Sequence, residues 1–263
     1  MARTVLLDID GVLTMSWRAL PGAAETLRWL RNEGIGFGLV TNTSSKSRRE
    51  IAGTLTEEGI DVDVPEIFTA VSSAARYLTT RYPSTRCLVI NEGSLDDDLT
   101  GVDIVGPDSA NVVLLGGAGA SIGYGELDAV FKMAVDGVPI VALHRNTRFQ
   151  TAEGPALDMG AFILGLEAAA RIEIPVVGKP APEFFRAALL DLGAASNEAM
   201  VVGDDIDSDV RGGQALGMTG VLVKTGKYRS SDLETAGHAP DHLIEDIRQL
   251  PELLGQPLGG QSP

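Results

Sequence analysis

Short apolar runs alternate with longer amphipathic stretches along the chain, a pattern typical of an α/β protein whose parallel sheet is covered by helices. Each apolar run is too short for a buried helix and is bounded by glycine or polar residues. The predicted strands are residues 5–7, 36–40, 88–90, 112–115, 140–143, 200–202 and 221–223. The pattern predicts a doubly wound, Rossmann-like sheet.

Amphipathic stretches between these runs predict the helices. Pro21 opens the first helix and Gly34 closes it, while Ser45 is placed to cap a second helix that ends at Gly59. The remaining helices are expected at about 73–81, 127–134, 182–192 and 208–216. A final helix is expected to carry Leu243, Ile247, Leu250 and Leu254.

With 263 residues, the chain can form one large domain or two moderate ones. Its single cysteine, Cys87, excludes an intrachain disulfide and lies in an apolar run, which predicts an inert core thiol. No apolar stretch approaches the length of a membrane span, and acidic residues stand where a signal peptide would be apolar. We therefore expect a soluble, cytoplasmic protein with no membrane partner, ending in a disordered tail over residues 255–263.

The formal net charge of −15 repels polyanions and argues against a nucleic-acid partner. A protein this acidic needs local cations, such as a metal ion and a placed lysine, if it is to bind phosphate. Two glycine-rich segments do not supply a nucleotide site. Residues 116–119 lack the spacing of a dinucleotide-binding loop, and Gly226-Lys227 is followed by Tyr228 where a Walker loop needs Ser or Thr.

Asp8 and Asp10 follow the first apolar run and are two residues apart, so alternation along a strand places them on the same side. At the carboxyl end of a central parallel strand, this side faces the crevice where doubly wound folds bind ligands. Two carboxylates there favour a shared cation or a held proton. A role as a strand-to-turn cap is the structural alternative.

Three more polar clusters lie at predicted element ends, and the doubly wound topology brings such ends together. They are Thr41-Asn42-Thr43-Ser44, Gly178-Lys179-Pro180 and the acidic segment 203–209, which contains Asp204, Asp205 and Asp209. Each cluster alone has a structural explanation, as a cap, a surface lysine or a solvated loop. The four together favour one functional site.

In this order, the four clusters resemble the motifs of the haloacid dehalogenase-like (HAD) phosphatase superfamily. About 27 residues separate Leu13 from Thr41, which leaves no room for a cap domain, whereas about 137 separate Asn42 from Lys179. A cap between the second and third motifs is the arrangement of subclass IIA. The chain is similar to nitrophenyl-phosphatase-like and ribonucleotide-monophosphatase-like enzymes and to phospholysine phosphohistidine inorganic pyrophosphate phosphatase, whose ending resembles residues 220–228.

The resemblance implies a core domain at 1–72 and 176–254, with an inserted α/β cap domain at 73–175. It implies that Asp8 attacks phosphorus and forms an aspartyl-phosphate, and that Asp10 acts as general acid and base. Thr41, Asn42 and Lys179 would bind the phosphoryl oxygens. The reaction implied is hydrolysis of a small phosphomonoester.

The implied cofactor is Mg²⁺, a hard cation that takes oxygen ligands. Its protein ligands would be the Asp8 and Asp204 carboxylates and the Asp10 carbonyl oxygen. Asp205 would hold a metal-bound water, and Asp209 would orient Lys179. No departure from the family pattern occurs at these positions.

The cap is where the chain departs from its relatives, because Asp158-Met159-Gly160 stands where many carry a Pro-Gly pair. Candidate substrate residues near the end of the last cap strand are His144, Arg145 and Arg148. A structural histidine and two solvated arginines are the alternative interpretation. The sequence does not define the oligomeric state, and a homodimer through the cap is the association we expect.

Other functions remain open at this point. A receiver-type phosphoacceptor module also combines acidic residues, a threonine and a lysine, but it has no need of Asp10 or of the large insertion. A phosphomutase would share the catalytic set, although such relatives usually insert the cap after the first motif. A dehalogenase would not need the acidic metal loop, and a catalytically idle binding protein would not need every catalytic position filled.

Overall fold

The computed structural model describes residues 3–151, 154–235 and 237–255. The chain forms two compact units. Unit 1 comprises Met1–Thr41, Arg48–Phe68 and Lys179–Pro263, and unit 2 comprises Asn42–Ser47 and Thr69–Gly178. Among the described residues, no helix has the length and apolar character that a membrane crossing requires.

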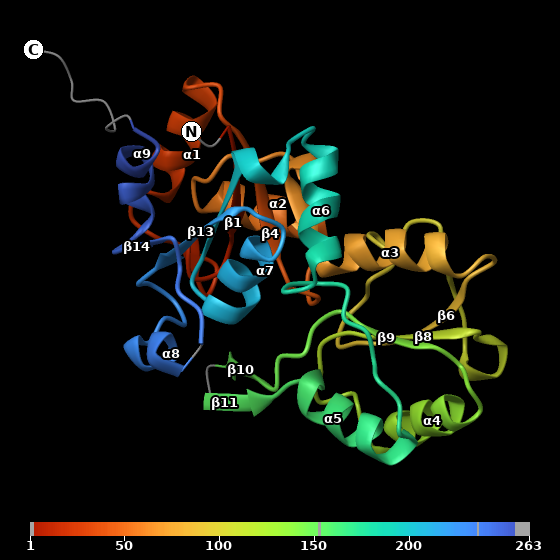
Figure 1. Ribbon diagram of the computed structural model, residues 1–263. Helices are drawn as coiled ribbons and strands as arrows, with labels where there is room; N and C mark the ends of the chain where they lie inside the picture. The colour runs from red at the N-terminus through yellow and green to blue at the C-terminus, as the bar shows by residue number, and fades with distance from the viewer. Residues whose placement is uncertain (1–2, 152–153, 236, 256–263) are drawn as a thin grey trace, which may run out of the picture. The chain divides into compact units, whose positions relative to one another are not determined.

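Unit 1 is built on a six-stranded sheet in the order β14-β13-β12-β1-β4-β5. These strands are β1 (Thr4–Asp8), β4 (Gly36–Thr41), β5 (Ile67–Thr69), β12 (Ala199–Gly203), β13 (Thr219–Val223) and β14 (His242–Ile244). β1 pairs in parallel with β4 on one side and with β12 on the other. Strands from the two ends of the chain therefore lie side by side, as the red and cyan-to-blue ribbons show (Figure 1).

The side chains of β1 point alternately to the two faces of this sheet and are buried on both. Val5 and Leu7 pack in one apolar cluster with α1 (Ala23–Asn32), α2 (Arg48–Glu57) and α9 (Leu250–Leu253). Leu6 packs on the opposite face with α6 (Pro182–Asp191). A strand that is fully buried on both faces is typical of a central parallel strand, which fixes the backbone just before Asp8.

Smaller elements of unit 1 complete the sheet edges and connections. They are β2 (Thr14–Met15), β3 (Arg18–Ala19), the π-helix η4 (Ile206–Arg211), α7 (Gly212–Gln214), α8 (Ser230–Thr235) and the 3₁₀ turns η1 (Val64–Glu66), η3 (Ser196–Glu198) and η5 (Ile247–Gln249).

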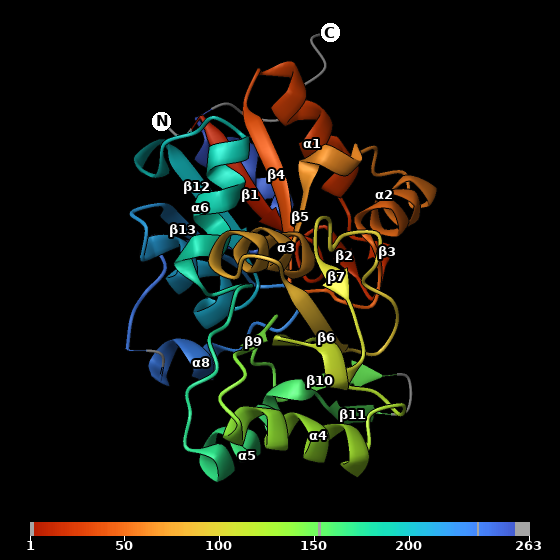
Figure 2. The same cartoon turned by 90° about the vertical axis from the view of Figure 1, so that its right-hand side faces the viewer.

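Unit 2 has its own four-stranded parallel sheet, β7-β6-β8-β9 (Figure 2). Its strands are β6 (Arg86–Ile90), β7 (Asp103–Ile104), β8 (Val112–Leu115) and β9 (Ile140–Ala142), and η2 spans Pro107–Ser109. α3 (Ala70–Arg81) packs on one face, and α4 (Tyr124–Val135) and α5 (Met159–Ala170) pack on the other. β10 (Arg148–Thr151) and β11 (Gly154–Leu157) form an antiparallel pair.

The predicted fold class, a parallel-sheet α/β core with a second α/β unit, is confirmed, but two local predictions, the Ser45 cap and the helical placement of Leu243, were wrong. Helix α2 begins at Arg48, so Ser45 does not cap it; the segment 42–47 belongs to unit 2, where the Asn91 amide donates to the carbonyl of Ser44. The helix expected at about 208–216 is present as η4 and α7, and it begins at Ile206, where the Asp205 carboxylate caps it.

Leu243 lies in strand β14 and not in the final helix, because its backbone pairs with β13. The spacing of Leu243, Ile247, Leu250 and Leu254 imitated one continuous helix. The predicted tail disorder concerns residues 255–263, and all of these except Gly255 lie outside the described residues.

Candidate active site

The carboxyl ends of three neighbouring strands meet in unit 1. Asp8 ends β1 opposite Val40, and Thr41 ends β4. Leu7 pairs with Val202, so Gly203 and then Asp204 continue β12 beside Asp8. Residues from the first, second and fourth predicted motifs thus reach the same edge of the sheet, where doubly wound folds bind ligands.

Lys179 brings the third motif to this edge and is almost completely buried. Its ammonium nitrogen lies 2.7 Å from Asp8 Oδ1 and 2.6 Å from Asp209 Oδ1. It also donates to the carbonyl of Val40 at 3.4 Å. Burial disfavours the ammonium, but the negative charges of Asp209 and Asp8 more than offset this and raise the pKa of Lys179 above its ordinary value. Lys179 is therefore a permanent cation of the site.

The two oxygens of Asp8 have different surroundings. Oδ1 accepts a hydrogen bond from the Ile9 backbone N–H at 2.8 Å and also contacts the Lys179 ammonium. Oδ2 accepts no hydrogen bond from any residue that the structure describes. The carboxylate is thus held by one oxygen while the other is available.

Asp204 is positioned by a loop that follows β13. Its Oδ2 accepts the Lys227 backbone N–H at 2.7 Å, and the Thr225 hydroxyl donates to the carbonyl of Gly11. Gly11 and Gly226 flank the same oxygen at positive φ, and a Cβ on either residue would lie 2.0 Å from it. Only glycine fits at these two positions.

The other oxygen of Asp204, Oδ1, is buried and has no hydrogen-bond partner among the described residues. Burial raises the pKa of Asp204, and the charges of Asp8 and Asp209 raise it further. An unpaired buried carboxylate oxygen is costly unless a cation or a proton compensates it. This oxygen is therefore a candidate metal ligand.

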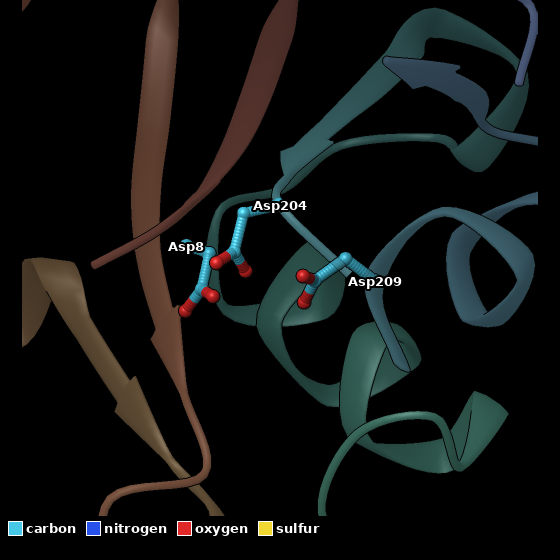
Figure 3. Close-up of side chains that lie close together, drawn as sticks. All are labelled: Asp8, Asp204 and Asp209. Carbon is cyan, nitrogen blue, oxygen red and sulfur yellow. The ribbon is translucent and has the colours of Figure 1, made fainter. Parts of the chain in front are cut away.

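Asp8, Asp204 and Asp209 each place one oxygen within 4.8 Å of the other two (Figure 3). All three side chains are buried. Asp209 uses Oδ1 on Lys179 and Oδ2 on the Asp205 N–H, whereas Asp8 and Asp204 each keep one oxygen without a hydrogen bond from a described residue and are the carboxylates able to hold a cation. This all-oxygen set, which includes the unpartnered Oδ1 of Asp204, fits a hard divalent ion such as Mg²⁺.

Asp10 is more accessible to solvent than Asp8. Its Oδ1 accepts the Ser16 N–H at 2.7 Å. Partial burial raises the pKa of Asp10, the Ser16 hydrogen bond lowers it, and the charge of Asp8 raises it, with a net increase. Asp10 is thus held in place and retains a proton more readily than an ordinary carboxyl group.

One oxygen of the Asp205 carboxylate is used within its own loop. Its Oδ1 accepts the N–H groups of Asp207 and Ser208, both at 3.0 Å, and caps η4. Its own N–H donates to Asp209 Oδ2 at 3.2 Å. Asp205 therefore shapes the loop that presents Asp204 and Asp209.

Asn42 and the three predicted cap residues belong to unit 2. His144 is buried with Nδ1 at 3.9 Å from Asp158 Oδ2, and Arg145 forms an ion pair with Glu167. Arg148 is exposed at the start of β10. His144 and Arg145 thus make contacts within their own unit.

The sequence analysis missed three residues that the structure adds to the site: Ser16, Thr225 and Lys227. Ser16 lies in the β2–β3 turn, where it and Trp17 have positive φ without the glycine or asparagine that signals such a turn. Lys227 was considered only for a Walker loop. The similarity of residues 220–228 to the C-terminal segment of a related phosphatase group was the signal that could have pointed to Lys227.

Comparison with known proteins agrees with this geometry. The model of the haloacid dehalogenase-like hydrolase family matches residues 5–105, and a model of HAD-like hydrolases matches residues 176–250. Haloacid dehalogenase-like hydrolase domain-containing protein 2 of Homo sapiens is 36% identical over 256 residues, covering 93% of this chain and 97% of that protein. The chain belongs to the HAD hydrolase family.

Other HAD hydrolases share both sequence and structure with it. Phospholysine phosphohistidine inorganic pyrophosphate phosphatase of Homo sapiens is 33% identical over 260 residues, covering 97% of this chain and 94% of that protein. The structure of p-nitrophenyl phosphatase from Archaeoglobus fulgidus has a TM-score of 0.90 at 29% identity and covers 96% of this chain and 99% of that one. The predicted subclass and enzyme class are confirmed: this HAD hydrolase is a phosphoric monoester hydrolase.

Proposed function

We propose that this HAD hydrolase is a Mg²⁺-dependent phosphatase that cleaves a small phosphomonoester through an aspartyl-phosphate on Asp8. The observation that carries the proposal is the buried arrangement of Asp8 and Asp204. Asp8 is anchored by one oxygen to Lys179, and Asp204 offers an unpartnered oxygen nearby. Such a site combines a nucleophile, a fixed cation and a place for a second cation.

Asp8 is the proposed nucleophile. Its Oδ1 is fixed by Lys179 and by the Ile9 N–H, so the free oxygen can attack phosphorus without rotation of the carboxylate. The P–O bond to the leaving group breaks as the bond to Asp8 forms, which splits one difficult hydrolysis into two easier steps. Asp209, paired with Lys179, keeps that lysine in place.

Asp10 is the proposed general acid and base. Its raised pKa favours a protonated carboxyl that can donate to the leaving oxygen in the first step. The resulting carboxylate can then take a proton from the water that hydrolyses the aspartyl-phosphate. The Ser16 N–H keeps the carboxylate oriented through both steps.

Mg²⁺ would be held by the carboxylates of Asp8 and Asp204 and by the Asp10 carbonyl oxygen. When bound, it supplies positive charge that offsets the repulsion between a carboxylate and a phosphate dianion. We propose that Asp205 would hold a metal-bound water and that Thr41, Asn42 and Lys179 bind the phosphoryl oxygens. A role for Thr41 is supported by its place at the end of β4, next to the strand that carries Asp8.

A small substrate is supported by the relatives' names, which include a p-nitrophenyl phosphatase and an inorganic pyrophosphate phosphatase. We propose that unit 2 is the cap that covers the leaving group, with Arg145 and Arg148 as candidate contacts. A homodimer through the cap, a cytoplasmic location and the absence of a nucleic-acid partner remain predictions from the sequence.

The test is phosphate release from a panel of small esters, including nitrophenyl phosphate, with and without a chelator. Chelation should abolish turnover, added Mg²⁺ should restore it, and Ca²⁺ should inhibit because its higher coordination number misplaces the nucleophile. Asp8→Asn should be inactive, whereas Asp61→Asn, a control at an exposed aspartate of unit 1, should keep wild-type activity. Full turnover in excess chelator, or an active Asp8→Asn enzyme, would contradict the proposal.

A further inference from the structure

A pocket of ≈ 280 Å³ adjoins the proposed site within unit 1. Asp204 and Lys227 line it, and Asp204 also belongs to the carboxylate cluster proposed to hold the metal ion, so the pocket lies next to that cluster. Ile206, Leu222 and Tyr228, which pack together in one apolar cluster, line it as well. The pocket can therefore receive a small group attached to a phosphoryl group at Asp8.

The carboxylates that line this pocket already have partners. Asp204 accepts the Lys227 N–H, and Asp205 caps η4. Asp207 lies 3.7 Å from the Arg211 guanidinium, and Asp232 accepts the Ser231 hydroxyl. Asp205, Asp207 and Asp232 thus each contact a group of the protein, and Asp204 keeps its Oδ1 for the proposed metal ion.

Lys227 and Arg229, the two cationic residues that line the pocket, do not have such partners in the described part of the chain. The side chains of Lys227 and Arg229 are exposed, and neither forms a hydrogen bond or an ion pair with any described residue. Lys179, by contrast, uses its ammonium on Asp8, Asp209 and the carbonyl of Val40. Of Lys179, Lys227 and Arg229, the two that line the pocket are therefore the ones whose side chains form no hydrogen bond or ion pair with a described residue.

We propose that Lys227 and Arg229 bind a second anionic group of the substrate, a carboxylate or a second phosphate, in this pocket. The inference rests on the proposed phosphatase function and adds a substrate class to it: phosphomonoesters whose leaving group is itself negatively charged. The apolar floor accommodates the short carbon chain between the two anionic groups.

The experiment compares three esters of the same length: 3-phosphooxypropanoate, propyl phosphate and 3-aminopropyl phosphate, which carry an anionic, neutral or cationic end. The wild type should have its highest kcat/KM on the anionic ester and its lowest on the cationic one. Lys227→Met or Arg229→Met should lower the ratio of the anionic to the neutral ester about tenfold, the loss expected for one charge-assisted hydrogen bond. Lys227→Arg should keep most of that ratio.

Lys224→Met is the matched control, because Lys224 belongs to the same loop but pairs with Glu245. It should leave the ratio unchanged. Calorimetric binding of the three esters to the inactive Asp8→Asn protein gives a second reading that does not depend on turnover. It should show the same order of affinity.

Turnover of the neutral ester with no preference for the anionic one, or an unchanged ratio in both the Lys227 and Arg229 variants, would overturn the pocket assignment and leave the phosphatase function standing. Failure to turn over any of the three esters in Mg²⁺ would instead overturn the proposed function, and the substrate class with it.

Discussion

Replacing Lys179 by methionine tests the electrostatic design of the site. The substitution keeps a long buried side chain but removes the charge that lies 2.7 Å from Asp8 and 2.6 Å from Asp209. Removing one partner from a buried ion pair costs about 3–5 kcal/mol, because the remaining carboxylates stay buried without compensation. For a chain of 263 residues, this corresponds to a fall in Tm of about 6–20 °C.

Urea unfolding followed by tryptophan fluorescence measures this loss of stability. The signal reports on unit 1, which contains Lys179, because both tryptophans, Trp17 and Trp29, lie in that unit. Lys224→Met is the control: its ion pair with Glu245 lies at the surface and is screened by water, so its loss should lower stability far less than Lys179→Met does. Adding Asp209→Asn to Lys179→Met should recover part of the lost stability, because one uncompensated charge is removed.

The loss should also depend on pH, with a sign that follows from linkage. Burial already raises the pKa of Asp209 in spite of the Lys179 charge, and removing that charge raises it further. In the variant, the unfolded carboxyl group then loses its proton at lower pH than the folded one, so stability falls as pH rises above about 4. The difference between variant and wild type should therefore be larger near pH 7 than near pH 4. A loss below about 1 kcal/mol, or one that does not change with pH, would refute the reasoning.

Three further predictions concern the metal site and the core of unit 2. Mg²⁺ affinity measured by calorimetry should increase with pH, because the raised pKa of Asp204 makes metal binding compete with a proton, and Asp204→Asn should remove both the affinity and most of this dependence. Gly226→Ala should lower Mg²⁺ affinity and stability more than Gly217→Ala does; both positions have positive φ, but a Cβ would meet Asp204 only at Gly226. Cys87, buried with its pKa raised to about 12, should resist alkylation in the native protein and react in urea, and rapid native alkylation would contradict its burial.

The sequence predicted which side chains meet at the carboxyl edge of the unit 1 sheet, because these side chains lie at the ends of strands. Asp8, Thr41 and Asp204 each follow a strongly apolar run, and parallel pairing places such ends together. Lys179 was included as part of a polar cluster at an element end, but a lysine before a proline has no periodicity that points to a buried ion pair. Its burial is a consequence of tertiary packing.

The parts that the sequence did not predict depend on turns without clear signals. The Ser16–Trp17 turn adopts positive φ with residues that rarely do so, so neither the β2–β3 hairpin nor the hydrogen bond to Asp10 was foreseen. Leu243 continued an apparent helical spacing but pairs as a strand. Local patterns failed where long-range backbone pairing determined the structure.

The most direct test of the account is whether phosphate is transferred to Asp8 when Asp10 cannot assist hydrolysis. The Asp10→Asn enzyme should release nitrophenol from nitrophenyl phosphate in a rapid burst near one equivalent per active site, because this leaving group needs no proton, and then turn over slowly. After an acid quench, mass spectrometry should find the phosphoryl group on the peptide that contains Asp8. Wild-type turnover of alkyl phosphates by Asp10→Asn, with no phosphate on Asp8, would contradict the account.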